Sequence, residues 1–508
     1  MSKELTLEEI QNFKGKYPKQ IWSLFFSEMW ERFCFYGMRG MLVFFMIDQL
    51  KMAEGQSQLQ YAAIQAFVYA FTFVGGLFAD KILGFRKSLF WGGFLMIIGS
   101  ILLSTNPHNL FFIGIAFTVV GTGFFKPNIS TMVGELYKKG DERTDAGFSL
   151  FYAGINLGAF LGGYLCIAIG KGHMFTSFID EAHRWNVAFG LAALVMTISL
   201  INFFFTERHL GPIGLQPKVK NKDGKEVRMP LAKEIAVYAG TLLAIPLIMA
   251  MVQNTDYTDY FMYTVGPLTL MYLFYEMTKV TSAERKKLYA ALVFILFSIL
   301  FWGIYEQAGG SLSIFAANHL TSNVLGIPLD PNGVNNSGGA FFIILFAPLL
   351  GLAWIWLAKK KIEPNTVIKF GLGFILLGAG YYVLFGTSFF ADAAGVTSLD
   401  FFILALLVIT FGELCLSPIG LSIMTKLSTH NLQGMMMGMW FLASAYGQYV
   451  AGIIGSSMSN SVVDGASNLD KLYSFTNGYK EIALYAVIAG VILILISPLV
   501  RKLMQDVK

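Results

Sequence analysis

Long apolar runs recur along almost the whole chain, and they limit its possible folds more than any other feature. A run of about 20 apolar residues can cross a bilayer as one helix, and a helix satisfies its own backbone hydrogen bonds in lipid. We therefore predict an all-α polytopic membrane protein. Its fourteen transmembrane helices are expected at residues 21–50, 59–82, 88–105, 110–137, 146–170, 184–206, 232–253, 261–279, 288–318, 338–358, 366–390, 399–427, 432–458 and 480–500.

The composition leaves little material for a water-exposed surface. Only 14% of the 508 residues are charged, whereas soluble domains carry about 25%. This balance excludes a disordered scaffold, a nucleic-acid-binding domain and a secreted disulfide module. Cys34, Cys166 and Cys415 all lie in apolar runs, too far apart for a disulfide framework or a metal site. We predict no cofactor and no metal.

Lys and Arg residues are distributed unevenly between the two ends of the predicted helices. Loops on the side of the N-terminus hold 29 of the 37, the opposite loops hold 5, and 3 lie inside helices. Cytoplasmic loops are enriched in these residues, so we predict a plasma-membrane protein with both termini in the cytoplasm. The first apolar run lacks a short core followed by a small-residue cleavage site, so we expect no cleaved signal peptide.

A charged connector after residue 206 divides the predicted helices into groups of six, two and six. It contains a predicted polar turn at residues 221–225. We expect a cytoplasmic N-terminal segment at 1–20, a six-helix bundle at 21–206, a linker with two extra helices at 207–287, a second six-helix bundle at 288–500 and a cytoplasmic tail at 501–508.

The two groups of six share a pattern of small residues and prolines. The pair Gly121 and Pro127 has the same spacing as Gly412 and Pro418. Small residues also repeat at spacing four in both halves, at Gly154, Gly158 and Gly162 and at Gly447, Ala451 and Gly455. The match favours an internal duplication, which is common in transporters. Small residues at spacing four also serve simply to pack membrane helices, so both interpretations stay open.

Seven charged residues lie well inside the predicted helices, away from their ends, where a charge costs several kcal/mol unless it is paired or hydrated. In the first helix the polar side chains fall within an arc of about 140° at 100° per residue, and Glu28 and Arg32 form an i,i+4 pair. The opposite face is apolar. The seven are Glu28, Glu31, Arg32, Arg39, Lys126, Glu306 and Glu413.

The seven charges have two interpretations. Buried ion pairs can fix helix register, although such pairs rarely add stability over apolar packing. Alternatively, four acids against three bases leave one carboxylate that can bind and release a proton. A proton-coupled carrier needs such a group. Asn156 needs a hydrogen-bond partner within its helix bundle, and Tyr36, Tyr152, Trp302, Tyr305 and Trp440 are candidates to line a substrate cavity.

Six motifs in order resemble the proton-dependent oligopeptide transporter family of the major facilitator superfamily, including its bacterial members with two extra helices. They are Glu28-x-x-Glu31-Arg32-Phe33 with Tyr36-Gly37, Gly75-Gly76-x-x-Ala79-Asp80, Phe124-Phe125-Lys126-Pro127-Asn128, Phe151-Tyr152-x-x-Ile155-Asn156-Leu157-Gly158, Trp302-x-x-Tyr305-Glu306-Gln307 and Gly412-Glu413-Leu414-x-Leu416-Ser417-Pro418. The resemblance implies a major facilitator fold and a proton-coupled symporter that imports di- and tripeptides across the bacterial inner membrane by alternating access.

The resemblance also implies roles for individual residues. Proton coupling is expected of Glu28, Glu31, Arg32 and Glu306. The peptide is expected to contact Tyr36, Arg39, Lys126, Asn156, Trp302, Glu413 and Trp440. Gating salt bridges are expected to use Arg39 with Glu306 and Lys126 with Glu413. The expected partners are small peptides, protons and the lipid bilayer, with no nucleic acid and no obligate protein partner.

Two departures from the family pattern leave the substrate class open. Phe35 stands where many members have Tyr, and Gly339-Ala340 stands where many have Asn-Pro. A carrier of the same fold for nitrate, a drug or an amino-acid derivative is therefore the alternative. An intramembrane enzyme would need a nucleophile with a base, or a metal motif. The predicted helices contain no such arrangement, so we predict that the protein is not an enzyme.

Overall fold

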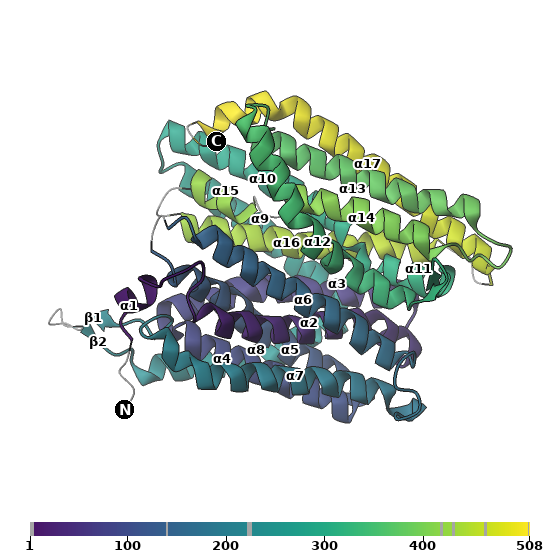
Figure 1. Ribbon diagram of the computed structural model, residues 1–508, viewed down its shortest axis with the longest axis horizontal. Coiled ribbons are helices and arrows are strands. Elements are labelled where there is room, and N and C mark those ends of the chain that lie inside the picture. The colour runs from purple at the N-terminus through teal and green to yellow at the C-terminus, as the bar shows by residue number, and fades with distance from the viewer. Residues whose placement is uncertain are drawn as a thin grey trace. The chain divides into compact units, whose positions relative to one another are not determined.

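The computed structural model describes residues 5–138, 141–220, 226–416, 420–428, 432–461, 465–505 and 507. Most of these residues are helical (Figure 1). The helices are α1 (Leu7–Gln11), α2 (Ile21–Asp48), α3 (Glu54–Phe78), α4 (Phe85–Thr105), α5 (Pro107–Glu135), α6 (Thr144–Gly170), α7 (Arg184–Thr206), α8 (Leu231–Gln253), α9 (Thr255–Met277), α10 (Ser282–Tyr305), α11 (Ser311–His319), α12 (Pro331–Lys359), α13 (Thr366–Gly386), α14 (Leu399–Leu416), α15 (Gly420–Leu427), α16 (Gln433–Asn460) and α17 (Asn468–Met504).

Shorter elements join the helices. The π-helical turn η1 (Ala79–Leu83) continues α3, and 3₁₀ turns form η2 (Glu181–His183), η3 (Glu207–Leu210), η4 (Glu306–Gly309) and η5 (Thr387–Phe390). Strands β1 (Val219–Lys220) and β2 (Glu226–Val227) pair antiparallel, as do β3 (Asn323–Val324) and β4 (Ile327–Pro328). The predicted polar turn at 221–225 lies outside the described residues.

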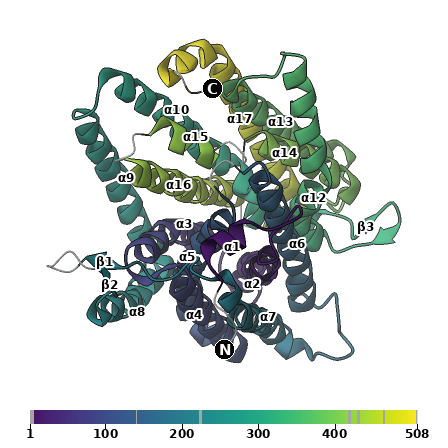
Figure 2. The same ribbon diagram turned by 60° about the vertical axis from the view of Figure 1, so that its left-hand side comes forward.

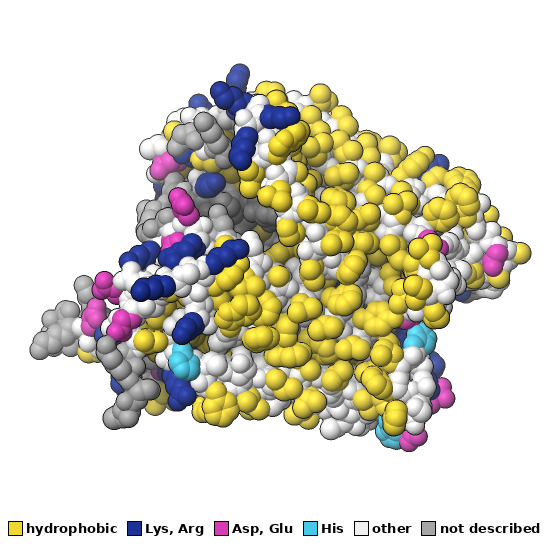
Figure 3. All heavy atoms as spheres, viewed as in Figure 1, with side chains coloured by type: hydrophobic (Ala, Val, Ile, Leu, Met, Phe, Trp, Pro, Cys, Tyr) yellow, Lys and Arg dark blue, Asp and Glu magenta, His cyan; other side chains and the backbone are white. Residues whose placement is uncertain are grey.

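Eleven helices in the described part of the chain are long and apolar enough to cross a membrane, which makes this a multi-pass membrane protein. Helices α2, α9 and α16 coincide with predicted spans and contain 28, 23 and 28 residues, but they are not among the eleven. The predicted count of fourteen therefore stays a prediction. In Figure 3, hydrophobic side chains cover the visible lateral surface, and Lys and Arg side chains gather at one end.

The chain divides into two compact units. Unit 1 contains Met1–Met41 and Phe67–Gln253, and unit 2 contains Leu42–Ala66 and Asn254–Lys508. The division falls inside α2 and α3 and between α8 and α9. The domain bounds predicted from the sequence, such as those at residues 206 and 287, stay a prediction.

Both units contain helices that meet at paired glycines. In unit 1 a Cβ built on Gly92 of α4 would lie 2.5 Å from the carbonyl oxygen of Gly121 in α5, and one on Gly121 would lie 2.6 Å from that of Gly92. In unit 2 the corresponding values are 2.9 Å and 2.7 Å for Gly373 of α13 and Gly412 of α14. Real Cβ atoms do not come this close, so only glycine permits these backbone contacts.

The two extra helices are attached to different units. Helix α8 packs on unit 1, where Trp91 Nε1 donates to Thr241 Oγ1 at 3.0 Å and Lys87 pairs with Glu234 at 2.7 Å. Helix α9 packs on unit 2, where Tyr449 donates to the Asp259 carboxylate at 2.6 Å. Each extra helix thus has its own polar anchor in the unit to which it belongs.

Candidate functional site

The charged stretch of α2 forms a compact ion-pair cluster inside unit 1. Arg32 Nε lies 3.0 Å from Glu28 Oε1, and its Nη2 contacts Glu31 Oε2. The exposed fractions of Glu28, Glu31 and Arg32 are 2%, 0% and 2%. The predicted i,i+4 pair is confirmed, and one guanidinium serves two carboxylates. The cluster therefore carries one excess negative charge when both acids are ionised.

Close packing of neighbouring helices holds this cluster in place. A Cβ on Gly158 of α6 would lie 2.1 Å from the Met29 carbonyl oxygen and 2.9 Å from Arg32 Cβ. One turn later, a Cβ on Gly162 would lie 2.2 Å from the Phe33 carbonyl oxygen. The apolar face of α2 is therefore buried against α6. Helices α4 and α7 also lie beside α2 (Figure 2). Ser100 of α4 contacts Cys34, and Ser199 of α7 donates to the Ser27 carbonyl.

Lys126 lies in α5 directly before Pro127, as the sequence indicates. Its Nζ lies 4.4 Å from the centroid of the Tyr69 ring and 6.0 Å from that of Phe35. Pro127 has no N–H and cannot bond the carbonyl of Gly123. A Cβ on Gly75 would lie 2.1 Å from that same carbonyl oxygen, so the first Gly of the Gly75-Gly76 motif allows α3 to approach the interrupted part of α5.

Arg39, Tyr36 and Asn156 complete the predicted residues of unit 1. The Arg39 guanidinium lies 5.8 Å from the centroid of the Tyr36 ring, and Arg39 is 9% exposed. Asn156 is 5% exposed, and its amide donates to the Tyr152 carbonyl of its own helix at 2.9 Å. The partner that the Asn156 amide requires is thus intrahelical. Tyr152 itself is 36% exposed.

In unit 2 the predicted span at 288–318 is interrupted. Helix α10 ends at Tyr305, η4 follows, and α11 begins at Ser311. Glu306 lies at this break and is 5% exposed. Polar side chains bond the carbonyls on both sides of it, since Gln307 donates to Gly303 O at 3.2 Å and Asn335 donates to Ala308 O at 2.7 Å. Broken helices of this kind are tolerated where neighbouring groups complete the backbone hydrogen bonds.

Glu413 of α14 has a partner that the sequence did not predict. The Tyr305 hydroxyl donates a hydrogen bond to Glu413 Oε2, and Glu413 is 9% exposed. Trp302 packs edge-on against Tyr305, with ring centroids 5.3 Å apart. Among the described residues, the buried Nε1–H of Trp302 meets no acceptor. Trp302, Tyr305 and Glu413 thus form one group on the α10 and α14 side of unit 2.

Trp440 of α16 lies against α15. A Cβ on Gly420 would come within 2.0 Å of the Trp440 ring, and Trp440 is 7% exposed. Ser417 and Pro418 of the sixth motif lie outside the described residues. The predicted Arg39–Glu306 and Lys126–Glu413 salt bridges each join residues of different units, and both stay predictions.

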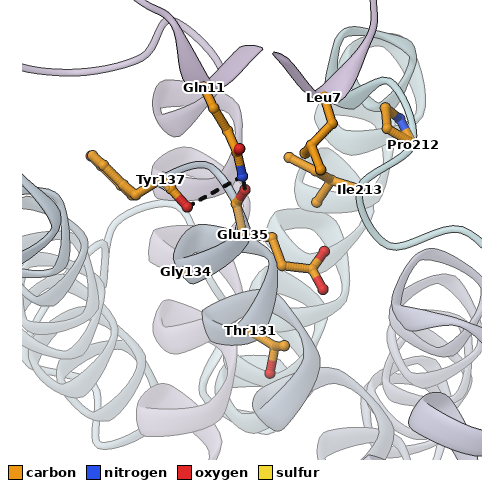
Figure 4. Close-up of a pocket in the computed structure, with 8 residues that line it drawn as sticks. All are labelled: Leu7, Gln11, Thr131, Gly134, Glu135, Tyr137, Pro212 and Ile213. Carbon is orange, nitrogen blue, oxygen red and sulfur yellow. Dashed lines mark hydrogen bonds between the residues drawn. The ribbon is translucent and has the colours of Figure 1, made fainter. Parts of the chain in front are cut away.

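A surface pocket in unit 1 is separate from the predicted residues. It has a volume of about 520 Å³ and lies beneath α1. Figure 4 shows Gln11 reaching the main-chain carbonyl groups of Glu135 and Tyr137, at 2.9 Å and 3.2 Å. The same N-terminal segment is held by Arg143, which donates to the carbonyls of Phe13 and Gly15 at 3.1 Å each. The contacts around this pocket anchor the N-terminal segment on unit 1.

Comparison with known proteins finds relatives over almost the whole chain. A family model described as the POT family matches residues 86–470. Peptide transporter YePEPT from Yersinia enterocolitica subsp. palearctica is 32% identical over 512 residues, covering 96% of each chain. The di-/tripeptide transporter of Lactococcus lactis is 30% identical over 509 residues, covering 97% of each. A crystal structure of a peptide transporter POT in complex with sulfate has a TM-score of 0.79 at 30% identity, covering 99% of this chain and 100% of that one.

Proposed function

Because this chain belongs to the POT family of transporters and has their major facilitator fold, we propose that it is a proton-coupled symporter that imports di- and tripeptides by alternating access. The observation that carries the proposal is the buried cluster of Glu28, Glu31 and Arg32. The cluster places two acids on one guanidinium, and a second cation that acts on both acids, Lys126, lies on another helix, α5. The second acid is a site where a proton can bind and leave.

The charges inside the two units are complementary to a zwitterion. Besides Arg32, which pairs with Glu28 and Glu31, unit 1 contributes the cations Arg39 and Lys126. The predicted residues of unit 2 contribute two acids, Glu306 and Glu413. Both ends of a peptide must be compensated when it leaves water. We assign its carboxylate to Arg39 and Lys126 and its ammonium to Glu413, with Asn156 as a further polar contact.

The remaining predicted residues recognise the uncharged parts of the peptide in this proposal. Trp302 supports this role, because its buried N–H is available to a substrate carbonyl. Tyr36 contacts the peptide backbone, and Trp440 shapes a side-chain pocket. Glu306 lies at the break between α10 and α11. There we propose that it pairs with Arg39 in one state of the transport cycle and takes up a proton when that pair opens.

Proton movement supplies the free energy for accumulation. A charge that crosses the membrane gains about 2.3 kcal/mol per 100 mV, and each pH unit adds about 1.4 kcal/mol. One proton at about 150 mV can therefore sustain roughly a 300-fold gradient of a neutral peptide. The proposal needs no metal and no cofactor besides the coupling proton, and no protein partner. It places the chain in the bacterial inner membrane with both termini in the cytoplasm.

The proposal is tested by uptake of labelled dialanine into proteoliposomes with an imposed pH gradient. Lys126→Ala should abolish uptake. Glu31→Gln should remove accumulation driven by the gradient but leave exchange of labelled for unlabelled peptide. Wild-type protein that accumulates no peptide would refute the proposal. Nitrate, drugs and amino-acid derivatives are tested as competitors, and uptake of one of these without peptide uptake would establish the alternative carrier.

A further inference from the structure

A basic pocket lies where α12, α13 and α17 end on one side of unit 2. Its volume is about 800 Å³, and its lining includes Lys369, Arg501 and Lys502. Among the described residues 351–370 and 491–505, six cations accompany a single carboxylate, Glu363. Glu363 pairs with Lys369, and neither Arg501 nor Lys502 forms an ion pair with any described residue. Within the lining itself Glu363 balances Lys369, so Arg501 and Lys502 give the described lining two excess positive charges.

A polar contact between two helices fixes one wall of the pocket. Asn365 caps α13 by accepting hydrogen bonds from the N–H groups of Val367 and Ile368 at 3.0 Å and 3.1 Å. Ser497 of α17 also donates to Asn365, at 3.2 Å. The capped N–H groups are occupied, so an anion in this pocket would be bound by the cationic side chains.

Exposed apolar side chains lie on α17 next to the pocket. Leu495 and Leu499 are 73% and 61% exposed, and they precede Lys502 by seven and three residues. At 3.6 residues per turn these three side chains share one face of the helix. Helix α12 shows the same order, because Ile355 and Trp356, both 55% exposed, lie one turn before Lys359.

Tryptophan and lysine mark the depth of this pocket relative to a bilayer. Lys360 Nζ lies 3.8 Å from the centroid of the Trp356 ring, and Lys369 Nζ lies 4.7 Å from that of Trp354. Tryptophan is enriched at the level of lipid headgroups. We therefore expect the apolar faces of α12 and α17 at the depth of the acyl chains and the cations at the depth of the phosphates.

We propose that this pocket is a binding site for the headgroup of an anionic phospholipid, whose acyl chains lie along the exposed leucines of α17. Basic pockets between membrane helices suit anionic headgroups. A soluble anion would use the cations but not the apolar face, whereas a phospholipid uses both. The inference requires only that the chain spans a membrane, and it is independent of the transported solute.

The test measures lipid binding to the purified full-length protein by native mass spectrometry, with phosphatidylglycerol and phosphatidylcholine added separately. Each cation near an anionic headgroup contributes about a fivefold preference. Arg501→Gln with Lys502→Gln should therefore weaken phosphatidylglycerol binding about 25-fold and leave phosphatidylcholine binding unchanged. Lys369→Gln changes a cation on another helix and should cost about fivefold, so the test does not depend on one variant folding.

The control removes two cations elsewhere. Lys14 and Lys16 are exposed residues of the N-terminal segment, and the Lys14→Gln, Lys16→Gln variant should bind phosphatidylglycerol as wild type does. An equal loss in this control would overturn the proposal, because binding would then follow net charge alone. Displacement of the lipid by millimolar inorganic phosphate would also overturn it, because the pocket would then be a site for free anions.

Discussion

Gly158 has no side chain, and this lets α6 pack closely against the part of α2 that carries the charged cluster. A Cβ at this position meets the Met29 main chain at 2.1 Å, and main chain cannot move aside as a side chain can. We expect Gly158→Ala to lower the free energy of unfolding by about 1–3 kcal/mol and to reduce gradient-driven uptake. Thermal unfolding and proteoliposome uptake measure the two effects.

Gly240 in α8 provides the matched control for this substitution. A Cβ there has nothing within 4 Å, and alanine is favoured over glycine inside a helix by about 0.5–1 kcal/mol. Gly240→Ala should therefore leave stability unchanged or raise it slightly. Equal destabilisation by the two substitutions would mean that close packing at Gly158 is unimportant.

The Tyr305 hydroxyl donates a hydrogen bond to Glu413 in the proposed ammonium site. A hydrogen bond to a charged group contributes about 1.5–3 kcal/mol. Tyr305→Phe should therefore raise KM for peptides with a free amino group by about tenfold or more, and the maximal rate should change less. Tyr382→Phe is the control, because Tyr382 is 57% exposed. An unchanged KM for Tyr305→Phe would exclude this role of the hydroxyl.

Arg143, which holds the N-terminal segment, forms an ion pair with Asp141 at 2.7 Å, and this pair keeps its charge over the pH range of a proton gradient. Hydrogen bonds from the Arg143 side chain and main chain lower the pKa of Asp141 to about 2. A carboxylate whose pKa is lowered on folding stabilises the fold above its ordinary value of 3.8 and loses that effect as the pH falls through 2. Amide exchange of residues 5–18, corrected for intrinsic rates, should therefore be equal at pH 7 and pH 5 and rise only below about 4.

The charged residues of the candidate site could be predicted because a charge inside an apolar run is conspicuous. Helix geometry alone predicted the Glu28–Arg32 pair. The bond from Tyr305 to Glu413 could not be predicted, because it joins side chains 108 positions apart and the chain has 22 tyrosines. Asn156 was correctly expected to need a partner, but the Tyr152 carbonyl in its own helix competes with every tertiary partner.

At the scale of the elements, most helices could be predicted from apolar runs, and their ends and breaks could not. The span predicted at 288–318 appeared continuous because the residues at its break are mostly small or apolar. The adjacent glycines Gly309 and Gly310 were the one feature of the sequence that indicated a break in this helix. Helix α17 begins at Asn468, twelve residues before the predicted start at 480, because Ser467 and Asp470 form a capping box that the hydrophobicity pattern does not reveal.

The separate anchors of α8 and α9 predict that either helix can be loosened alone. Tyr449→Phe removes the bond to Asp259 and should speed amide exchange in α9 by several-fold, since one hydrogen bond contributes about 1 kcal/mol. Exchange in α8 should not change. Thr241→Val removes the hydrogen bond from Trp91. It should speed amide exchange in α8 and leave exchange in α9 unchanged. If either variant speeds amide exchange equally in α8 and α9, the two helices are not anchored independently.

At the scale of the whole molecule, the distribution of Lys and Arg predicts the orientation in the membrane. The native cysteines are buried, with exposed fractions of 0% for Cys34 and Cys166 and 5% for Cys415, so an introduced cysteine can be labelled without removing them. Phe178→Cys, at a position 86% exposed in the wild type, should react with a membrane-impermeant maleimide in intact cells. Lys14→Cys should react only after the cells are opened, and the reverse pattern would invert the proposed topology.

Paired glycines limit which substitutions this sequence can accept. The pairs are Gly92 with Gly121 and Gly373 with Gly412. At these positions even alanine forces two backbones apart, whereas the lipid-facing residues around them can exchange among Leu, Ile, Val and Phe at little cost. Exhaustive mutagenesis should therefore find the least tolerant sites of this protein where its side chains are smallest. An engineer who wishes to alter its surface has wide freedom, provided that glycines in close backbone contact, such as these four, are left untouched.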